Sequence, residues 1–186
     1  MISCLSRRAL IGGLSGAVVA GATPVFGKAP AILKGKGVYR SLRIFNAKTG
    51  DKLSTAYWVE GKYIHEALEA FSYIMRDWRA NEAIGIDPRV IDIMSATQQL
   101  LETSEPIEIV SGYRSPETNA RLRRRRRGVA RNSYHTRGMA ADITMKTRTP
   151  RQIAYAAMAL KAGGVGKYTR AKFTHVDCGP LRDWGR

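Results

Sequence analysis

The sequence predicts an α+β fold in which helices pack on a small antiparallel sheet. Short runs that alternate apolar and polar residues are typical of strands, and the first two, residues 41–46 and 52–59, flank the turn residues Thr49-Gly50-Asp51. Longer segments place their apolar residues at helical spacing instead. Because helices are mixed along the chain with short, hairpin-like strands, we expect the α+β class.

Two helices are predicted after this hairpin. Residues 63–79 carry apolar side chains at helical spacing. The next helix begins at Asp87-Pro88, because aspartate is a favoured N-cap and proline fits the first helical position, and it runs towards Glu102. His65 falls in the first of these helices, where we expect an ordinary surface or half-buried residue.

Proline also marks the start of the last two helices. Ser115-Pro116 caps a helix that we expect to continue to about Arg127 and to stop at Gly128. Thr149-Pro150 opens the final helix, which Gly163-Gly164 closes. The remaining strands are expected at residues 106–110, 142–145, 165–168 and 173–176.

The N-terminus has the layout of a signal peptide. Arg7-Arg8 precedes an apolar, glycine-rich run over residues 11–26, and the arginine pair resembles a twin-arginine export signal. That run is shorter than the ~20 residues of a membrane span. We therefore expect export to the periplasm with no stable membrane span after cleavage, which could follow Ala22 or Ala29.

The domain boundaries follow from the same pattern. We expect a signal peptide at residues 1–29, a linker rich in glycine, lysine and proline at 30–40, and one folded domain at 41–186, because 186 residues fit a single ordinary domain. Cys4 lies in the expected signal peptide, which leaves Cys178 without an intrachain partner. The oligomeric state is left open.

A histidine, an aspartate and a second histidine form a candidate metal site. His135 and Asp142 flank Gly138, which lets the chain turn so that a loop histidine and a strand aspartate can converge. His175 lies in a later strand, where Asp177 shares its face because alternate residues point the same way. Two imidazoles and one carboxylate suit a catalytic zinc site with one open position, although spacing alone equally allows three unrelated polar residues.

Four motifs, in order, resemble one peptidase family. The segment Ser133-x-His135-x-x-Gly138-x-Ala140-x-Asp142 resembles the SxHxxGxAxD signature of the M15 zinc peptidases, which are related to D-Ala-D-Ala carboxypeptidases and lysostaphin. Over residues 41–184 the chain is similar to the branch of this family that contains murein endopeptidase K. The other three motifs are Ser111-Gly112-Tyr113-Arg114-Ser115-Pro116, Gly163-Gly164-Val165-Gly166 and Phe173-x-His175-x-Asp177-x-Gly179.

The resemblance implies a fold, a cofactor and a substrate. It implies a hedgehog-like α+β sheet that carries Zn²⁺ on His135, Asp142 and His175. The implied activity is hydrolysis of peptide cross-links in peptidoglycan, including those between two diaminopimelate residues. A carboxypeptidase that trims terminal D-Ala and a non-catalytic, zinc-containing peptidoglycan-binding module are the alternatives. Histidine and aspartate ligands also accept other divalent ions.

Arg114 and Asp177 are the candidate catalytic residues. Arg114 follows a predicted strand, where a fixed cation can stabilise the oxyanion that develops on a scissile carbonyl. The resemblance implies this role for it, since the family's arginine in this motif is assigned it. A surface arginine or a clamp for a substrate carboxylate is the alternative. Related peptidases often place a carboxylate or histidine just before the last ligand, but this chain has Lys172 and Phe173 there. Asp177 is then either the general base or the acceptor that orients His175.

The chain is strongly basic, with 31 lysines and arginines against 15 acidic residues and a net charge of +16. Such an excess favours anionic partners: nucleic acid, acidic lipid or a polyanionic cell wall. The run formed by Arg121, residues 123–127 and Arg131 lacks interleaved aromatic residues for base stacking, and export would separate it from DNA. We expect no nucleic-acid partner, and we expect this run to attract the carboxylates of wall peptides.

A serine hydrolase is not indicated. Ser111 and Ser133 lie in the matching motifs, but no GxSxG elbow is present to activate a serine. We therefore expect these two serines to support or cap the site.

Overall fold

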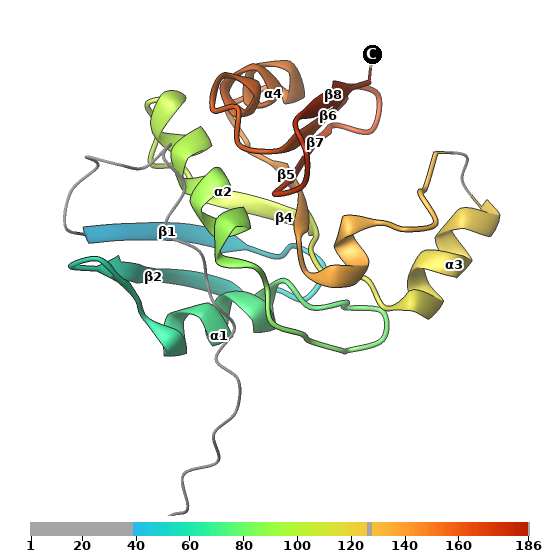
Figure 1. The fold of residues 1–186 in the computed structure, drawn as a ribbon, viewed down its shortest axis with the longest axis horizontal. Helices are drawn as coiled ribbons and strands as arrows, with labels where there is room; N and C mark the ends of the chain where they lie inside the picture. The colour runs from blue at the N-terminus through green and yellow to red at the C-terminus, as the bar shows by residue number, and fades with distance from the viewer. Residues whose placement is uncertain (1–38, 126–127, 186) are drawn as a thin grey trace, which may run out of the picture.

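The computed structural model describes residues 39–125 and 128–185 as one eight-stranded sheet with helices around it (Figure 1). The strands are β1 (Tyr39–Phe45), β2 (Lys52–Val59), β3 (Lys62–Tyr63), β4 (Ile107–Ser111), β5 (Ala140–Thr144), β6 (Gly164–Tyr168), β7 (Phe173–Asp177) and β8 (Arg182–Trp184). The helices are α1 (His65–Ile74), α2 (Pro88–Leu100), α3 (Pro116–Arg125), α4 (Pro150–Ala159) and the 3-10 turn η2 (Tyr134–Arg137).

The strand order across the sheet is β3-β2-β1-β4-β5-β7-β6-β8. Neighbouring strands are antiparallel except for two pairs, β1 with β4 and β6 with β8. The α+β class and the mostly antiparallel sheet are therefore confirmed. The N-terminal hairpin β1–β2 forms one half of the sheet, and β5, β7 and β6 form the other.

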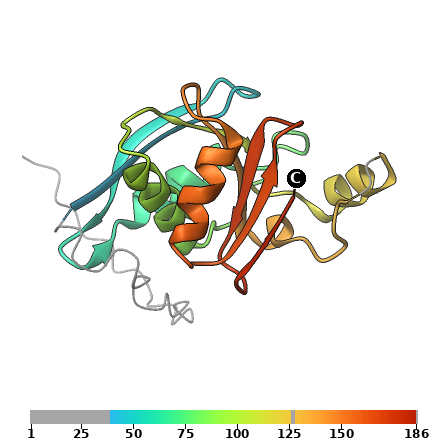
Figure 2. The same ribbon diagram turned by 90° about the horizontal axis from the view of Figure 1, so that it is seen from above.

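Three helices pack on the sheet, α1 on β2 and α2 and α4 further along it, and α3 stands apart. α2 contacts α4, and both pack against strands of the C-terminal half; the fully buried core includes Ile91 and Met94 of α2, Ile143 of β5 and Ile153 of α4. Figure 2 shows α3 projecting away from this body. Within the described residues no helix is both long enough and apolar enough to cross a membrane.

The predicted helix starts are confirmed because their signals are local. Asp87 caps α2 by accepting a hydrogen bond from the Arg89 amide, with proline in the first turn. Thr149 caps α4 in a reciprocal capping box with Gln152.

Two helix ends were predicted wrongly. α1 ends at Ile74 rather than Arg79, because the carbonyls of Ile74 and Met75 accept hydrogen bonds from Asn46 and from the Tyr113 amide instead of continuing the helical ladder. α4 ends at Ala159, ahead of the glycine pair, and Gly164 is already the first residue of β6.

Strands β3 and β8 were not predicted, since each has only two or three residues and no alternating pattern. The expected signal peptide and all but two residues of the expected linker lie outside the described residues. Tyr39 and Arg40 of that linker belong to β1. The described part of α3 ends at Arg125, so the expected stop at Gly128 is not tested.

Candidate metal centre

Three neighbouring strands place polar residues side by side across the sheet. Ser111 of β4 pairs with Asp142 of β5, and Asp142 pairs with His175 of β7. Directly paired residues of an antiparallel ladder project to the same face, with their Cβ atoms about 5 Å apart. The register of the strands therefore brings Asp142 and His175 together.

His135 reaches the same face from the short turn η2, just before β5. Ser133 caps this turn by accepting a hydrogen bond from the His135 amide, and Gly138 ends it with a φ of 67°. A Cβ at Gly138 would lie 2.6 Å from the carbonyl oxygen of Gly85, so both the backbone conformation and the available space favour glycine.

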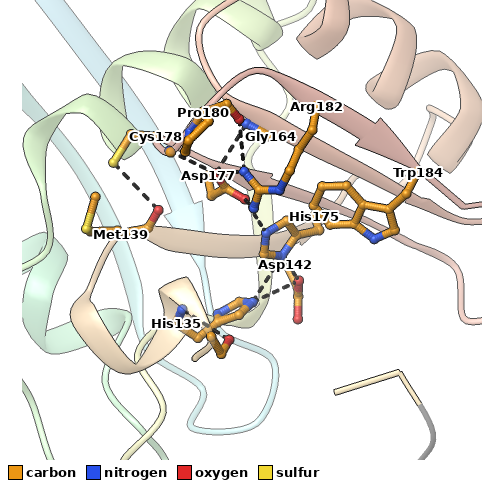
Figure 3. Close-up of polar contacts among 12 residues, drawn as sticks. His135, Met139, Asp142, Gly164, His175, Asp177, Cys178, Pro180, Arg182 and Trp184 are labelled. Carbon is orange, nitrogen blue, oxygen red and sulfur yellow. Dashed lines mark hydrogen bonds and ion pairs between the residues drawn. The ribbon is translucent and has the colours of Figure 1, made fainter. Parts of the chain in front are cut away.

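The three side chains converge on one point (Figure 3). His135 Nε2 lies 3.2 Å from Asp142 Oδ1 and 3.1 Å from His175 Nδ1, and the latter two atoms are 2.9 Å apart. All three residues are buried. Within the described part of the chain, this is the group of His, Cys, Asp and Glu side chains that could hold a metal ion.

The hydrogen bonds on the far side of each ring show which atoms are free. His135 Nδ1 lies 2.7 Å from the carbonyl oxygen of Gly112, which can only accept, so Nδ1 carries the proton and Nε2 presents a lone pair. His175 Nε2 lies 2.9 Å from Asp177 Oδ2, which likewise leaves His175 Nδ1 as a lone pair in the neutral ring. Two imidazole lone pairs and a carboxylate oxygen therefore face one another.

These atoms fit a tetrahedral zinc ion. Ligand atoms held at zinc's usual bond lengths of 2.0–2.1 Å are separated from one another by ~3.3 Å in a tetrahedron. The three measured separations, 2.9 to 3.2 Å, are close to that value. Three lone-pair atoms buried at such distances repel one another unless a proton or a cation lies between them.

Electrostatics favours the protonation state that a metal ligand needs in two of the three groups, the neutral ring of His135 and the ionised carboxylate of Asp142. Burial lowers the pKa of His135 below its ordinary value, which favours the neutral imidazole. Burial raises the pKa of Asp142, but the neighbouring His135 and His175 rings and the Arg114 charge outweigh it and hold that pKa well below its usual range. Burial lowers the pKa of His175, whereas its bonds to Asp142 and Asp177 raise it, with a net rise.

Arg114 lies at the edge of this cluster. Its Nε donates to Ser111 Oγ at 2.8 Å, and its Nη2 contacts Asp142 Oδ2, the carboxylate oxygen that faces away from the histidines. Its side chain is 13 % exposed, so it is mostly but not completely buried.

Gly112, in the same motif as Arg114, lies behind His135 as its Nδ1 partner. A Cβ at Gly112 would lie 2.2 Å from the carbonyl oxygen of Met75, so the site is packed directly against the end of α1.

Asp177 lies behind His175, on the side opposite the cluster. Its Oδ2 accepts from His175 Nε2 and from Arg182 Nη2, the latter at 2.6 Å. Its Oδ1 accepts from the amides of Gly164 and Gly179 and from Arg182 Nη1. Burial raises the pKa of Asp177, but these donors, led by His175, lower it to about 2. Both oxygens of this fully buried carboxylate are therefore occupied.

Sequence reasoning missed two residues beside the cluster, Arg182 and Trp184 of β8. Arg182 pairs with Asp177, and the Trp184 ring lies 5.2 Å from the His175 ring between centroids. The sequence of β8 has no alternating pattern that would predict a strand. Only Gly164 and Gly166, which lie opposite it, indicate that another part of the chain packs closely there.

The third histidine lies elsewhere. His65 is at the start of α1, where its exposed ring pairs with Glu69 one turn along the helix at 3.2 Å. This position matches the expectation of a surface helix residue.

Comparison with known proteins gives one consistent family. The family model described as peptidoglycan L,D-endopeptidase MepK matches residues 35–184. The peptidoglycan L,D-endopeptidase MepK of Escherichia coli K12 is 42% identical over 145 residues, which cover 78% of this chain and 80% of that protein. The probable peptidoglycan L,D-endopeptidase MepK of Haemophilus influenzae is 38% identical over 146 residues, 78% of each chain.

Among solved structures, the L-Ala D-Glu endopeptidase ChiX of Serratia marcescens matches 41% of this chain and 62% of its own. The TM-score is 0.34 and the sequence identity is 19%, a level that does not establish a shared fold.

Proposed function

The chain belongs to the MepK family of peptidoglycan L,D-endopeptidases, and on that premise we propose that it is an exported, zinc-dependent enzyme that hydrolyses peptide cross-links of peptidoglycan. Links between two diaminopimelate residues are among its substrates. The observation that carries the proposal is the convergence of His135 Nε2, Asp142 Oδ1 and His175 Nδ1 within 3.2 Å of one another.

His135, Asp142 and His175 would hold the ion. When bound, zinc supplies a Lewis acid that polarises a carbonyl and makes water nucleophilic near neutral pH. The protein's part is to hold both imidazoles in a fixed orientation with one ring nitrogen of each facing the site, which the acceptors Gly112 and Asp177 support through the far ring nitrogens.

Arg114 is proposed to stabilise the negative charge that builds up on the carbonyl oxygen of the scissile bond. A guanidinium has five N–H groups, and the contacts with Ser111 and Asp142 leave others to face a substrate. Because Ser111 and Asp142 fix its position before the substrate arrives, little reorganisation is needed during the reaction.

Asp177 is proposed to orient His175 rather than to act as the general base. A base must come within hydrogen-bond reach of the attacking water. Asp177 is separated from the cluster by the imidazole ring, and five donor contacts occupy its oxygens.

Peptidoglycan peptides are the proposed partner of the basic surface as well. α3 begins two residues beyond Arg114 and carries the exposed residues Arg121, Arg123, Arg124 and Arg125. A hollow of about 400 Å³ at its base is lined by Arg79, Arg121 and Arg124 together with two glutamates. This excess of positive charge on α3 suits the carboxylates of wall peptides.

Digestion of purified, cross-linked muropeptide dimers tests the reaction. We expect dimers joined through two diaminopimelate residues to yield monomers, an activity that a chelator removes and added zinc restores. His175→Ala should abolish the activity and the bound zinc, whereas the matched control His65→Ala should keep both. Release of D-Ala alone would identify a carboxypeptidase, and binding without products would identify a non-catalytic module.

Export is tested separately with the full-length chain. The pair Arg7-Arg8 is proposed to direct the folded protein to the periplasm. Replacing both arginines by lysine should leave the protein in the cytoplasm, while a control replacement at Arg43 and Arg148 should leave export unchanged. Equal periplasmic amounts of the lysine variant and the wild-type protein would contradict the twin-arginine assignment.

A further inference from the structure

The C-terminal strand β8 lies against the outer side of one candidate metal ligand. It pairs in parallel with β6, with Gly164 opposite Arg182 and Gly166 opposite Trp184. Figure 3 shows Arg182 and Trp184 reaching over β6 towards Asp177 and His175. Both long side chains therefore cross a neighbouring strand to reach the centre.

Arg182 begins a series of polar contacts that leads through Asp177 to the His175 ring, whose Nδ1 faces the proposed metal site. Its two terminal nitrogens bind both oxygens of Asp177, at 3.2 and 2.6 Å, and Asp177 Oδ2 in turn accepts from His175 Nε2 at 2.9 Å. A two-pronged arginine–carboxylate pair fixes the carboxylate in orientation as well as in position. The fixed carboxylate then fixes the plane and the tautomer of the His175 ring.

Trp184 holds the same imidazole from its side. Its ring is tilted by 51° to the His175 ring at a centroid distance of 5.2 Å, and its own Nε1 donates to the Tyr168 hydroxyl at 2.8 Å. The Arg182 guanidinium lies 5.0 Å from the centre of the Trp184 ring, so the two β8 side chains also support each other.

The glycines of β6 make this arrangement possible. A Cβ at Gly164 would lie 2.6 Å from both Asp177 Oδ2 and Arg182 Nη1, and a Cβ at Gly166 would lie 2.7 Å from the Trp184 ring. Neither glycine has a positive φ, so it is space rather than backbone conformation that excludes a side chain.

We propose that β8 is a positioning element of the metal centre, in which Arg182, acting through Asp177, and Trp184, acting on the ring itself, hold His175 ready to bind the ion. The inference rests on the proposed metal site. It assigns a role to a strand that contributes no ligand of its own.

Zinc affinity, measured by competition with a chromogenic chelator, tests this role without reference to catalysis. Arg182→Gln should weaken zinc binding roughly tenfold, at the lower end of the loss caused by removing an outer partner of a ligand. Arg182→Lys, which keeps the charge but not the two-pronged contact, should fall between this variant and the wild type. Arg151→Gln, at an exposed arginine on α4, is the matched control and should bind zinc like the wild type.

A spectroscopic measurement separates positioning from general stability. In the metal-free protein, the Nε2–H of His175 should give a slowly exchanging NMR signal, which Arg182→Gln should broaden or shift. Trp184→Phe should shift the same signal less than Trp184→Ala, while Trp58→Phe, in the distant N-terminal hairpin, should leave it unchanged. Thermal unfolding of each metal-free variant shows whether it folds.

The outcomes distinguish this inference from the proposed function. If the wild-type protein binds no zinc, both fail. If the wild type binds zinc, and folded Arg182→Gln and Trp184→Ala proteins match their controls in zinc affinity and in the His175 signal, the role of β8 is overturned and the proposed function stands.

Discussion

Two buried aspartates, Asp142 and Asp92, lie in opposite kinds of polar cluster. Asp92 of α2 accepts hydrogen bonds from the hydroxyls of Tyr57 and Tyr63, at 3.1 and 2.5 Å, and from Arg40 Nη1 at 3.3 Å. Burial raises the pKa of both tyrosines, so the two hydroxyls remain donors. We call these four residues the Asp92 cluster; both carboxylate oxygens of Asp92 have donors in it.

The candidate metal centre, defined as His135, Asp142 and His175 and called the metal centre below, lacks this balance. Asp142 Oδ1 faces His135 Nε2 and His175 Nδ1, and in each neutral ring the proton is on the other nitrogen. The carboxylate oxygen and both ring nitrogens therefore direct lone pairs at one another. The two aspartates are alike in residue type and in burial, but the number of hydrogens that their neighbours direct at them differs. The comparison teaches that a shortage of donors, rather than burial of a charge, distinguishes the candidate metal site.

The largest effect should come from breaking the metal centre. Asp142→Asn keeps the size of the side chain but removes the anionic ligand, so the affinity for zinc should fall by more than the 10–100-fold typical of an outer partner, and muropeptide cleavage should disappear. Metal content of the purified protein and product analysis measure the two effects. The matched control, Asp92→Asn, should retain zinc; equal zinc in the wild type and Asp142→Asn would undo the ligand assignment.

The converse change should break the Asp92 cluster and spare the metal centre. Asp92→Ala leaves the buried Arg40 without its carboxylate, and removing one partner of a buried ion pair typically costs about 3–5 kcal/mol. Denaturant unfolding in the presence of a chelator should show this loss. At a temperature where the variant is folded, its zinc stoichiometry should equal that of the wild type, and loss of zinc would show that the two clusters are coupled.

A smaller effect is expected in the pH dependence of the unfolding free energy. Burial raises the pKa of Asp92 more than its three donors lower it, so the folded protein holds this proton more tightly than the unfolded chain. The resulting stability is fully present below the ordinary pKa of 3.8 and is lost as the pH rises through the folded value. The difference in unfolding free energy between the wild type and Asp92→Asn, followed upward from pH 3.8, should therefore decrease; an increase would contradict the sign.

The smallest effect should come from charges that belong to neither cluster. Changing Arg123, Arg124 and Arg125 of α3 to glutamine should raise the KM for anionic muropeptides several-fold at low salt and leave kcat, zinc content and unfolding unchanged. At about 1 M salt, where the screening length is about 3 Å, the difference should vanish. A change in kcat would instead place these arginines in the reacting centre.

The features that could be predicted from the sequence are those set by local chemistry. The starts of α2 and α4 depend on Asp87-Pro88 and on Thr149-Pro150, whose caps act within three residues. The β1–β2 hairpin depends on alternation and on one turn. The candidate ligands were found because His135, Asp142 and His175 each lie within a short motif.

The features that could not be predicted depend on distant partners. The end of α1 is set by Asn46 and Tyr113, which no local pattern connects to it. Asp177 was left between two roles because strand alternation gives the face of a side chain but not what occupies its oxygens. Arg182, which occupies them, lies in a three-residue strand whose position depends on the parallel pairing with β6.

The pairing of Asp142 with His175 across β5 and β7 has a consequence for how the molecule matures. Because side chains alternate between the two faces of a strand, slipping either strand by one residue would turn its ligand to the opposite face. An ion that needs both can be retained only by molecules whose central strands have paired in the native alignment. The zinc content of a preparation would then report the fraction of molecules whose central strands have the native register. A molecule with a misaligned sheet would be inactive even if it were folded.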